Sequence, residues 1–155
     1  MIQKEKTVCF TGHRDIIISE VKPIKEIIEK KITEGFDTFL SGGARGFDHY
    51  AGLMVLKLKE KYPHIRLILI LPCNKDIMSN KWDNKDKAIL SEIILKSENV
   101  IYISDEYYNG CMKDRNAKLV ELSSFCIAYY KKYKSGTGQT VRMMERAKGE
   151  VFNIV

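Results

Sequence analysis

The clearest signal of the fold lies at residues 38–48, Thr38-Phe39-Leu40-Ser41-Gly42-Gly43-Ala44-Arg45-Gly46-Phe47-Asp48. It passes from a short apolar run through a glycine-rich turn into a segment whose apolar residues recur at helical spacing: Ala51, Met54, Val55 and Leu58. A strand, a glycine-rich turn and a helix in this order are typical of a phosphate-binding loop in a parallel sheet. Glycine lets the backbone approach an anion closely, and the helix N-terminus offers free N–H groups.

Two further glycine-bearing loops stand in the same context. Thr11-Gly12-His13-Arg14 follows the apolar run at residues 7–10. Ser135-Gly136-Thr137-Gly138-Gln139-Thr140 follows residues 125–130 and precedes a helical pattern. One such loop is a weak indication of a ligand site. Three of them in one chain, two with an arginine, indicate a nucleotide-like ligand.

The order of apolar patterns along the chain predicts the architecture. We expect six strands at residues 6–11, 38–41, 66–71, 100–103, 125–130 and 151–155, and four of them are near-continuous apolar runs, as in parallel strands buried on both faces. Helical patterns alternate with them at residues 21–32, 51–58, 86–96, 115–122 and 140–148. The alternation predicts an α/β fold: a single Rossmann-like domain over residues 1–155, doubly wound, with a mainly parallel six-stranded sheet in the order 3-2-1-4-5-6.

Local signals refine the element boundaries. Ser19 is a candidate N-cap of the first helix, Gly35 ends that helix, and Gly149 closes the last one. The segment at residues 72–82 is the one long irregular stretch, and a loop of this size after a strand is often functional.

Composition bounds the class of protein. The 155 residues are 45% hydrophobic and 30% charged, which is typical of a soluble globular domain. No apolar stretch approaches the roughly 20 residues of a membrane span, so we expect no membrane partner. The first residues lack the apolar region of a signal peptide, which favours a cytoplasmic location. The four cysteines lack paired metal-type spacing, so we expect core residues, no metal and no cofactor.

The net charge of +6 favours anionic partners, either nucleic acid or phosphorylated small molecules. Much of the lysine, however, lies at residues 22–31 and 57–61, where glutamate is interleaved with it. That pattern is typical of a solvated helix face, so the charge alone does not decide between the two partners.

The candidate site residues lie where the strands of such a sheet end. Ligands bind beyond the carboxyl ends of parallel strands, so the three loops should converge there. A backbone nest for phosphate is predicted from Ser41, Gly42, Gly43 and Gly46, with Arg45 and Arg14 as charge partners. Asp48 is either the N-cap of its helix or a ribose contact. His13 is either a hydrogen-bonding loop residue or a ligand contact or acid.

Aromatic residues supply a second group of candidates. Trp82, the only tryptophan, lies in the polar context Asn80-Lys81-Trp82-Asp83-Asn84, where it is either a core anchor or a lid that stacks on a base. Tyr107, Tyr108 and the run at residues 129–134, Tyr-Tyr-Lys-Lys-Tyr-Lys, could stack bases and hold phosphates. The alternative is that Tyr129 ends a strand and the lysines are solvated.

Six separated motifs occur in order along the chain: Thr11 to Arg14, Ser41 to Asp48, Leu71-Pro72-Cys73, Lys81-Trp82, Arg115-Asn116 and Ser135 to Thr140. Together they resemble the SLOG superfamily, specifically the small bacterial proteins of the DUF1273 group. The superfamily includes the DNA-processing protein DprA, the Lonely Guy phosphoribohydrolases and ligand-sensing domains of antiviral systems. The resemblance implies a Rossmann-like fold and a pocket for nucleotides or NAD-derived signals such as cyclic ADP-ribose. The residues implied at that pocket are Thr11, Gly12, His13, Arg14, Ser41, Gly42, Gly43, Arg45, Gly46, Asp48, Lys81, Trp82, Arg115, Asn116, Ser135, Gly136, Thr137 and Thr140.

Enzymatic activity does not carry over with the resemblance. Lonely Guy enzymes pair an arginine with a glutamate three residues after the Gly-Thr of their last glycine loop. Arg115 matches the arginine, but the position of the glutamate holds Thr140, which has no carboxylate for assisting a leaving base or activating water. Asp48, Asp83 or Asp114 could substitute from elsewhere in the fold.

The expected function is therefore that of a cytosolic binding protein for a nucleotide or an ADP-ribose-like signal, acting as a sensor or by sequestering the molecule. One alternative is an N-glycosidase or nucleoside deoxyribosyltransferase acting on the same ligands. A second alternative is a single-stranded DNA-binding protein. We also expect a homodimer or higher homo-oligomer, because Ile89, Leu90, Ile93, Ile94 and Leu95 surround more than half of a helix turn.

Overall fold

Six parallel strands form one sheet in the computed structural model, which describes residues 1–131 and 135–155. The strands are β1 (Thr7–Gly12), β2 (Thr38–Ser41), β3 (Arg66–Leu71), β4 (Asn99–Tyr102), β5 (Phe125–Tyr129) and β6 (Glu150–Asn153). Every pairing in the sheet is parallel. The predicted α/β, Rossmann-like architecture is confirmed, and each expected strand is present within a residue or two of its predicted position.

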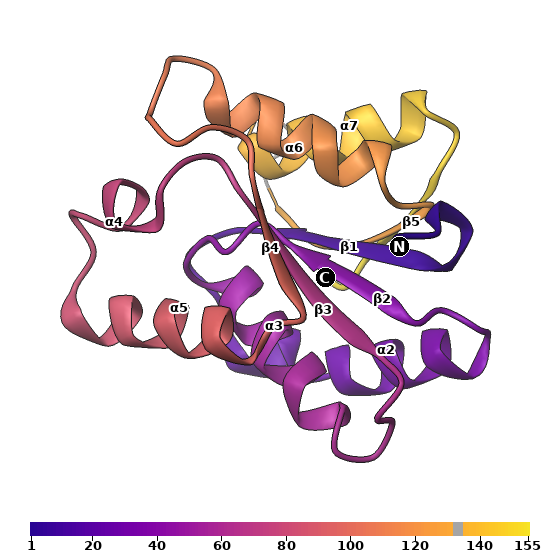
Figure 1. The fold of residues 1–155 in the computed structure, drawn as a ribbon. Coiled ribbons are helices and arrows are strands. Elements are labelled where there is room, and N and C mark those ends of the chain that lie inside the picture. Colours follow the sequence, from indigo (N-terminus) through magenta and orange to yellow (C-terminus); the bar gives the residue numbers. More distant parts are fainter. Residues whose placement is uncertain (132–134) are drawn as a thin grey trace.

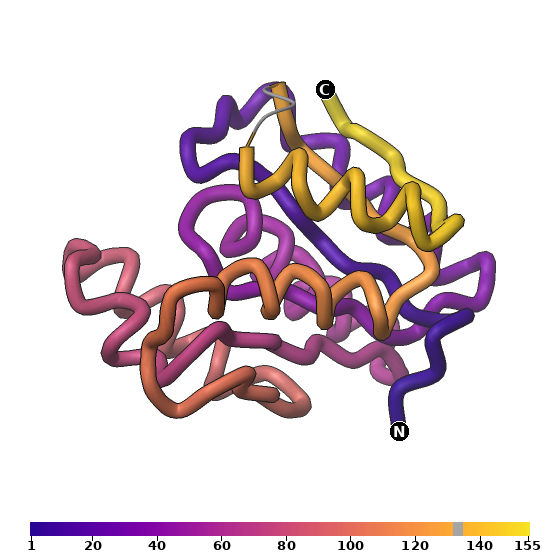
Figure 2. The backbone as a smooth tube through the Cα atoms, turned by 90° about the horizontal axis from the view of Figure 1, so that it is seen from above, coloured from indigo at the N-terminus to yellow at the C-terminus, as the bar shows by residue number. Residues whose placement is uncertain are grey.

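Helices cover both faces of this sheet (Figure 1). They are the 3-10 helix η1 (Lys4–Lys6) and the α-helices α1 (Ile18–Val21), α2 (Ile24–Thr33), α3 (Phe47–Leu58), α4 (Lys75–Met78), α5 (Asn84–Lys96), α6 (Cys111–Glu121) and α7 (Gly136–Arg146). Helices α2, α3 and α5 lie on one face, and α6 and α7 lie side by side on the other (Figure 2). In the described part of the chain, no helix is long and apolar enough to cross a membrane.

The predicted strand order is wrong at one position. The order in the sheet is β4-β3-β2-β1-β5-β6, so the fourth strand lies outside β3 instead of beside β1. The reason is that α5 packs against α3 on the same face of the sheet (Figure 1). A right-handed crossover on that face must continue in the direction already taken from β1 to β3. The chain changes direction only with α6, which covers the opposite face and leads to β5.

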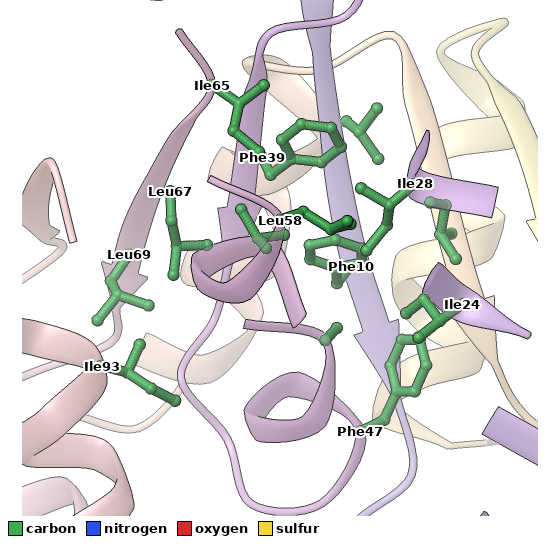
Figure 3. Close-up of a cluster of buried hydrophobic side chains, with 14 of the residues drawn as sticks. Phe10, Ile24, Ile28, Phe39, Phe47, Leu58, Ile65, Leu67, Leu69 and Ile93 are labelled. Carbon is green, nitrogen blue, oxygen red and sulfur yellow. The ribbon is translucent and has the colours of Figure 1, made fainter. Parts of the chain in front are cut away.

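A cluster of aromatic and aliphatic side chains fills the space between the sheet and α2, α3 and α5 (Figure 3). The ring centroid of Phe10 lies 6.1 Å from that of Phe39 and 6.3 Å from that of Phe47. These ring contacts connect β1 and β2 to the first turn of α3. On the other face, Cys9 and Cys126 pack with residues of α6 and α7. All four cysteines are buried, as predicted for core residues.

Several helix boundaries differ from those predicted: α3 and α6 each begin four residues before the predicted positions 51 and 115, and the starts of α2 and α7 differ as well. Pro23 separates α1 from α2, so Ser19 lies inside α1 and is not an N-cap. Proline has no N–H to donate, and it therefore stands at the start of a helix more readily than inside one. Helix α7 begins at Gly136, four residues earlier than expected, because Ser135 caps it by accepting the N–H of Gly138 at 3.0 Å.

The apolar residues of α5 are largely covered by the chain itself. Leu90 and Ile93 are buried, and Ile89 and Ile94 pack partly buried against the core cluster. Leu95 alone stays 83% exposed. Contacts within the chain thus explain most of the wide apolar stripe of α5, on which the expectation of a homo-oligomer rests. Homo-oligomer formation stays a prediction that light scattering can test.

Candidate functional site

A cleft lies at the carboxyl end of β1, between α3 on one face of the sheet and the first turns of α6 and α7 on the other. Strands β2 to β4 lie on one side of β1, and β5 and β6 lie on the other, so the strand order changes direction between β1 and β5. Open α/β sheets bind ligands at this position. The cleft consists of two adjoining hollows of about 170 and about 230 Å³. Both hollows are lined by Gly12, Ala44, Met112 and Arg115.

We call the two hollows the inner and the outer hollow. The inner hollow is further lined by Phe10, Thr11, Asp48, Asn116, Leu119, Gly136 and Thr137. The outer hollow is further lined by Arg14, Arg45, Met78 and Trp82. A third hollow of about 520 Å³ shares Met78 and Met112 with the outer one and contains Lys81 and Tyr107.

A larger depression of about 500 Å³ between α3 and α5 is a weaker candidate. Its lining is dominated by lysine and glutamate side chains, and three of the five, Lys59, Glu92 and Lys96, already have partners on the chain. Lys59 Nζ donates to the carbonyl of Ile65, and Lys96 forms an ion pair with Glu92 at 2.9 Å. We therefore place the site at the smaller cleft, where buried polar groups converge.

Arg115 is the buried cation of the cleft. It is 6% exposed, and α6 presents it from the second turn of the helix. Its Nη1 donates to the carbonyl oxygen of Gly42, and its Nε donates to Oδ1 of Asn116 at 2.8 Å. A Cβ atom at position 42 would fall 2.5 Å from Nη1, so only glycine permits this approach. Burial lowers the pKa of the guanidinium and the nearby Asp48 raises it, but arginine remains a cation at any physiological pH.

Asp48 is the buried carboxylate of the cleft and is 5% exposed. Helix α3 begins after its N-cap Gly46, so the N-cap interpretation of Asp48 is wrong: the residue lies in the first turn. Its Oδ2 accepts the N–H of Ala44 at 3.2 Å, whereas its Oδ1 has no hydrogen-bond partner in the described part of the chain. Burial raises the pKa of Asp48 to about 6, while Arg115 and the Ala44 N–H act in the opposite direction.

The loop between β2 and α3 uses several of its polar groups internally. Gly43 donates its N–H to Oγ of Ser41 at 3.1 Å, and Ala44 donates to Asp48. The carbonyl of Gly43 lies 3.1 Å from Nε2 of His49, a distance at which this ring nitrogen donates. Ser41, Gly42, Gly43 and Gly46 are not among the lining residues of the two hollows; Gly42 holds Arg115 through its carbonyl, and the neighbouring Ala44 holds Asp48. The backbone nest for phosphate that we predict from these residues stays a prediction.

The start of α7 closes the inner hollow. Gly136 and Thr137 line it, so the N-terminal end of this eleven-residue helix, with its positive partial charge, faces the same space as Arg115. Thr140 is fully buried, and its hydroxyl donates to the carbonyl of Gly136 at 3.3 Å. The position that holds a glutamate in Lonely Guy enzymes thus presents no acid to the hollow.

Trp82 forms the wall of the outer hollow and is half-buried. The guanidinium carbon of Arg45 lies 5.1 Å from its ring centroid, and the ring of His49 meets it edge to face at 5.5 Å. Trp82 is therefore neither a full core anchor nor a free surface residue. Its indole holds Arg45 at the mouth of the cleft by a cation–π contact.

His13 lies outside both hollows, beside a separate one with Arg14, Asp15 and Lys131. Its Nε2 accepts the N–H of Lys131 at 2.7 Å, so the imidazole ties the loop after β1 to the loop after β5. This contact fits the interpretation of His13 as a hydrogen-bonding loop residue. Tyr129 ends β5, as one alternative holds, and donates its hydroxyl to Glu20 at 2.7 Å. Residues 132–134 of the tyrosine- and lysine-rich run lie outside the described residues.

The structure thus brings together ten of the predicted site residues and sets the others around them. The ten that line the two hollows are Thr11, Gly12, Arg14, Arg45, Asp48, Trp82, Arg115, Asn116, Gly136 and Thr137. Sequence reasoning missed Met78 and Met112, which line the outer hollow, and His49, which supports the loop and Trp82. Methionine at helical spacing gives no signal of a ligand wall, and His49 could have been noticed only as the neighbour of Asp48.

The fold and the cleft define a Rossmann-like α/β protein with a buried arginine and a buried carboxylate at the switch point of its sheet. More specifically, the chain belongs to the YspA SLOG family, whose model matches residues 8–153. The resemblance to the SLOG superfamily inferred from the six motifs is confirmed.

Individual relatives are distant. A UPF0398 protein of Halalkalibacterium halodurans is 28% identical over 128 residues, which are 81% of this chain and 66% of the relative. Among solved structures, DNA processing protein A of Helicobacter pylori, described with a single-stranded DNA binding mode, matches with a TM-score of 0.72 and 19% identity. DprA of Streptococcus pneumoniae matches with the same TM-score and identity.

At this identity the two structural matches show the fold alone. They cover 97% and 96% of this chain. By contrast, this chain spans only 65% of the length of the Helicobacter protein and 50% of the length of the Streptococcus protein. The relatives are therefore longer than this chain, and part of each of them has no counterpart here.

Proposed function

We propose that this chain binds a small, phosphate-bearing, nucleotide-like molecule in the cleft at the end of β1. The observation that carries the proposal is the buried Arg115, which faces the same hollow as the N-terminus of α7. A buried cation and the positive end of a helix favour an anion in the space between them. Arg14 and Arg45 line the adjoining outer hollow and add positive charge at its mouth.

The depth of the polar groups favours a small molecule over a polymer. Asp48 and Arg115 are almost fully buried, so only a ligand that enters the inner hollow can contact them. Trp82 is placed to stack on a base in the outer hollow. An ADP-ribose-like or cyclic signalling molecule has the required phosphate, sugar and base, and the protein would then act as a sensor or would sequester the molecule.

Calorimetric titration with AMP, NAD, ADP-ribose and cyclic ADP-ribose isomers tests the proposal. We expect at least one of them to bind with micromolar affinity, and Trp82→Ala to weaken that binding about 5- to 100-fold through loss of stacking. Trp82→Phe is the matched control, because phenylalanine retains an aromatic face and should retain most of the affinity. Absence of heat with every ligand at high micromolar concentration would contradict the proposal.

An N-glycosidase acting on the same ligands is a second candidate, and Asp48 favours it. Asp48 is the one carboxylate among the residues that line the two hollows, and its raised pKa suits proton transfer near neutral pH. Chromatography of incubated ligand separates the two functions. Recovery of intact ligand supports a binding protein, whereas free base or a ribose phosphate indicates catalysis.

Single-stranded DNA binding is a third candidate, supported by the fold shared with DNA processing protein A and by the net charge of +6. On the small-molecule proposal, we expect a fluorescent oligothymidylate to bind more weakly than about 10⁻⁴ M at 50 mM salt, measured by anisotropy. If DNA is the ligand, binding is micromolar or tighter. The logarithm of the association constant then falls linearly with the logarithm of the salt concentration, with a slope of about −0.7 per phosphate contacted.

A further inference from the structure

Asp48 has one carboxylate oxygen to which no described residue donates a hydrogen bond. Its Oδ1 is buried and unpartnered in the described residues, although Oδ2 of the same group accepts the N–H of Ala44. A buried acceptor without a partner is costly, and such groups in native proteins usually mark a missing ligand, ion or water. Asp48 lines the inner hollow, so this buried oxygen belongs to a side chain that borders the space a ligand would occupy.

The charge around the hollow limits what that donor can be. Arg115 already offsets the charge of Asp48 in this hollow, and the N-terminus of α7 adds a positive partial charge. A cationic donor, whether an ammonium group or a metal ion, would be repelled by both. A neutral hydroxyl meets no such repulsion and forms a strong hydrogen bond to a carboxylate.

The size of the hollow limits the donor further. At about 170 Å³, the inner hollow is smaller than the roughly 300 Å³ at which whole-ligand pockets begin, so it can hold only part of a nucleotide. The anion-binding end of α7 and the carboxylate of Asp48 line this same small space. The part of a nucleotide that carries both a phosphate and neutral hydroxyls is its sugar phosphate.

We infer that Asp48 Oδ1 accepts a hydrogen bond from a hydroxyl of the ligand's ribose, so that this site takes ribonucleotides in preference to the deoxynucleotide lacking that hydroxyl. The inference rests on the proposed function, which it makes more specific. The acceptor is held in position before the ligand arrives, because Ala44 fixes Oδ2 and the loop that precedes Asp48 is tied to Arg115 through Gly42. Since only one oxygen of Asp48 lacks a donor in the described residues, one of the two ribose hydroxyls should matter far more than the other.

The test compares AMP with 2′-deoxy-AMP and 3′-deoxy-AMP by calorimetric titration of the whole chain. If AMP is not the ligand found in the nucleotide titration, the corresponding deoxy analogues of that ligand are used. We expect one deoxy analogue to bind about 10- to 100-fold more weakly and the other to bind within about threefold of the parent nucleotide. In Asp48→Asn, this discrimination should shrink to about threefold or less, because the one amide oxygen is needed for the Ala44 N–H and the NH2 group at the position of Oδ1 cannot accept a hydrogen bond.

Asp37→Asn is the matched control. Asp37 precedes β2 at the amino ends of the strands, opposite the cleft, and its Oδ1 accepts the hydroxyl of Thr38 at 2.9 Å. This variant should therefore discriminate like the parent chain. Equal affinities for the ribonucleotide and both deoxy analogues would overturn the inference and leave the proposed function standing. Failure of every nucleotide to bind would overturn both. The comparison of ligands on the parent chain decides the matter even if Asp48→Asn does not fold.

Discussion

An Arg115→Ala variant is expected to lose at least about 30-fold in nucleotide affinity and about 3 kcal/mol in free energy of unfolding. The binding loss follows because the one buried cation of the inner hollow is removed. The stability loss follows because the Gly42 carbonyl and Oδ1 of Asn116 lose their donor. Asp48 also loses the cation that lowers its pKa. Urea denaturation and calorimetric titration measure the two effects separately.

Two further variants separate the contributions of charge and geometry at position 115. Arg115→Lys keeps the charge but cannot reproduce the planar guanidinium that donates to Gly42 and Asn116 together, so we expect intermediate losses in both measurements. If Arg115 compensates the charge of Asp48, the double variant Asp48→Asn with Arg115→Ala should be less destabilised than Arg115→Ala alone. Unchanged affinity in Arg115→Ala would remove the main support for a ligand in this cleft.

The sequence predicts the elements of this fold better than their arrangement. Each strand is marked by a local pattern, a near-continuous apolar run in four of the six, so all six are recognisable along the chain. The position of β4 in the sheet is not a local property of the sequence. It depends on whether α5 packs on the face of the sheet that α3 covers or on the face that α6 covers. The apolar stripe of α5 shows that the helix is buried, but it carries no information on which face of the sheet buries it.

The candidate site shows the same division. Glycine-rich turns after strands predict where the cleft lies, because parallel strands end at one edge of the sheet. They do not predict that Gly43 and Ala44 donate to the side chains of their own loop. Likewise, Asp48 in the first turn of a helix has the composition of an N-cap. Only the position of Gly46 before the helix, with a φ of 82°, shows that the helix has already begun at Asp48.

The second large effect is expected at Asp48, where an Asp48→Asn variant should be more stable than the parent chain at pH 8. Burial raises the pKa of this carboxyl to about 6 from an unfolded value of 3.8. Between these two values the folded chain binds the proton more tightly than the unfolded chain, so the stability contributed by this group is lost as pH rises. Above pH 6 the ionised carboxylate costs about 3 kcal/mol, from a shift of about two units at 1.36 kcal/mol each.

Asparagine removes this titration but can still accept the N–H of Ala44 through its own carbonyl oxygen. The variant should therefore match the parent near pH 4 and gain up to about 3 kcal/mol at pH 8, a rise of up to about 6 to 12 °C in Tm for a chain of this size. Thermal denaturation across that pH range measures the difference. Ligand affinity should move the other way, because the amide NH2 group that replaces Oδ1 cannot accept the ligand hydroxyl.

Opposite changes in stability and affinity would assign Asp48 to binding, since a residue retained for the fold does not destabilise it when ionised. In the parent chain, affinity should also fall as pH drops below about 6, because protonation converts the acceptor into a neutral acid. Loss of stability in Asp48→Asn at pH 8, together with an unchanged pH profile, would contradict this account. Asp48 would then serve only to hold the Ala44 N–H, and the open oxygen would have no part in ligand recognition.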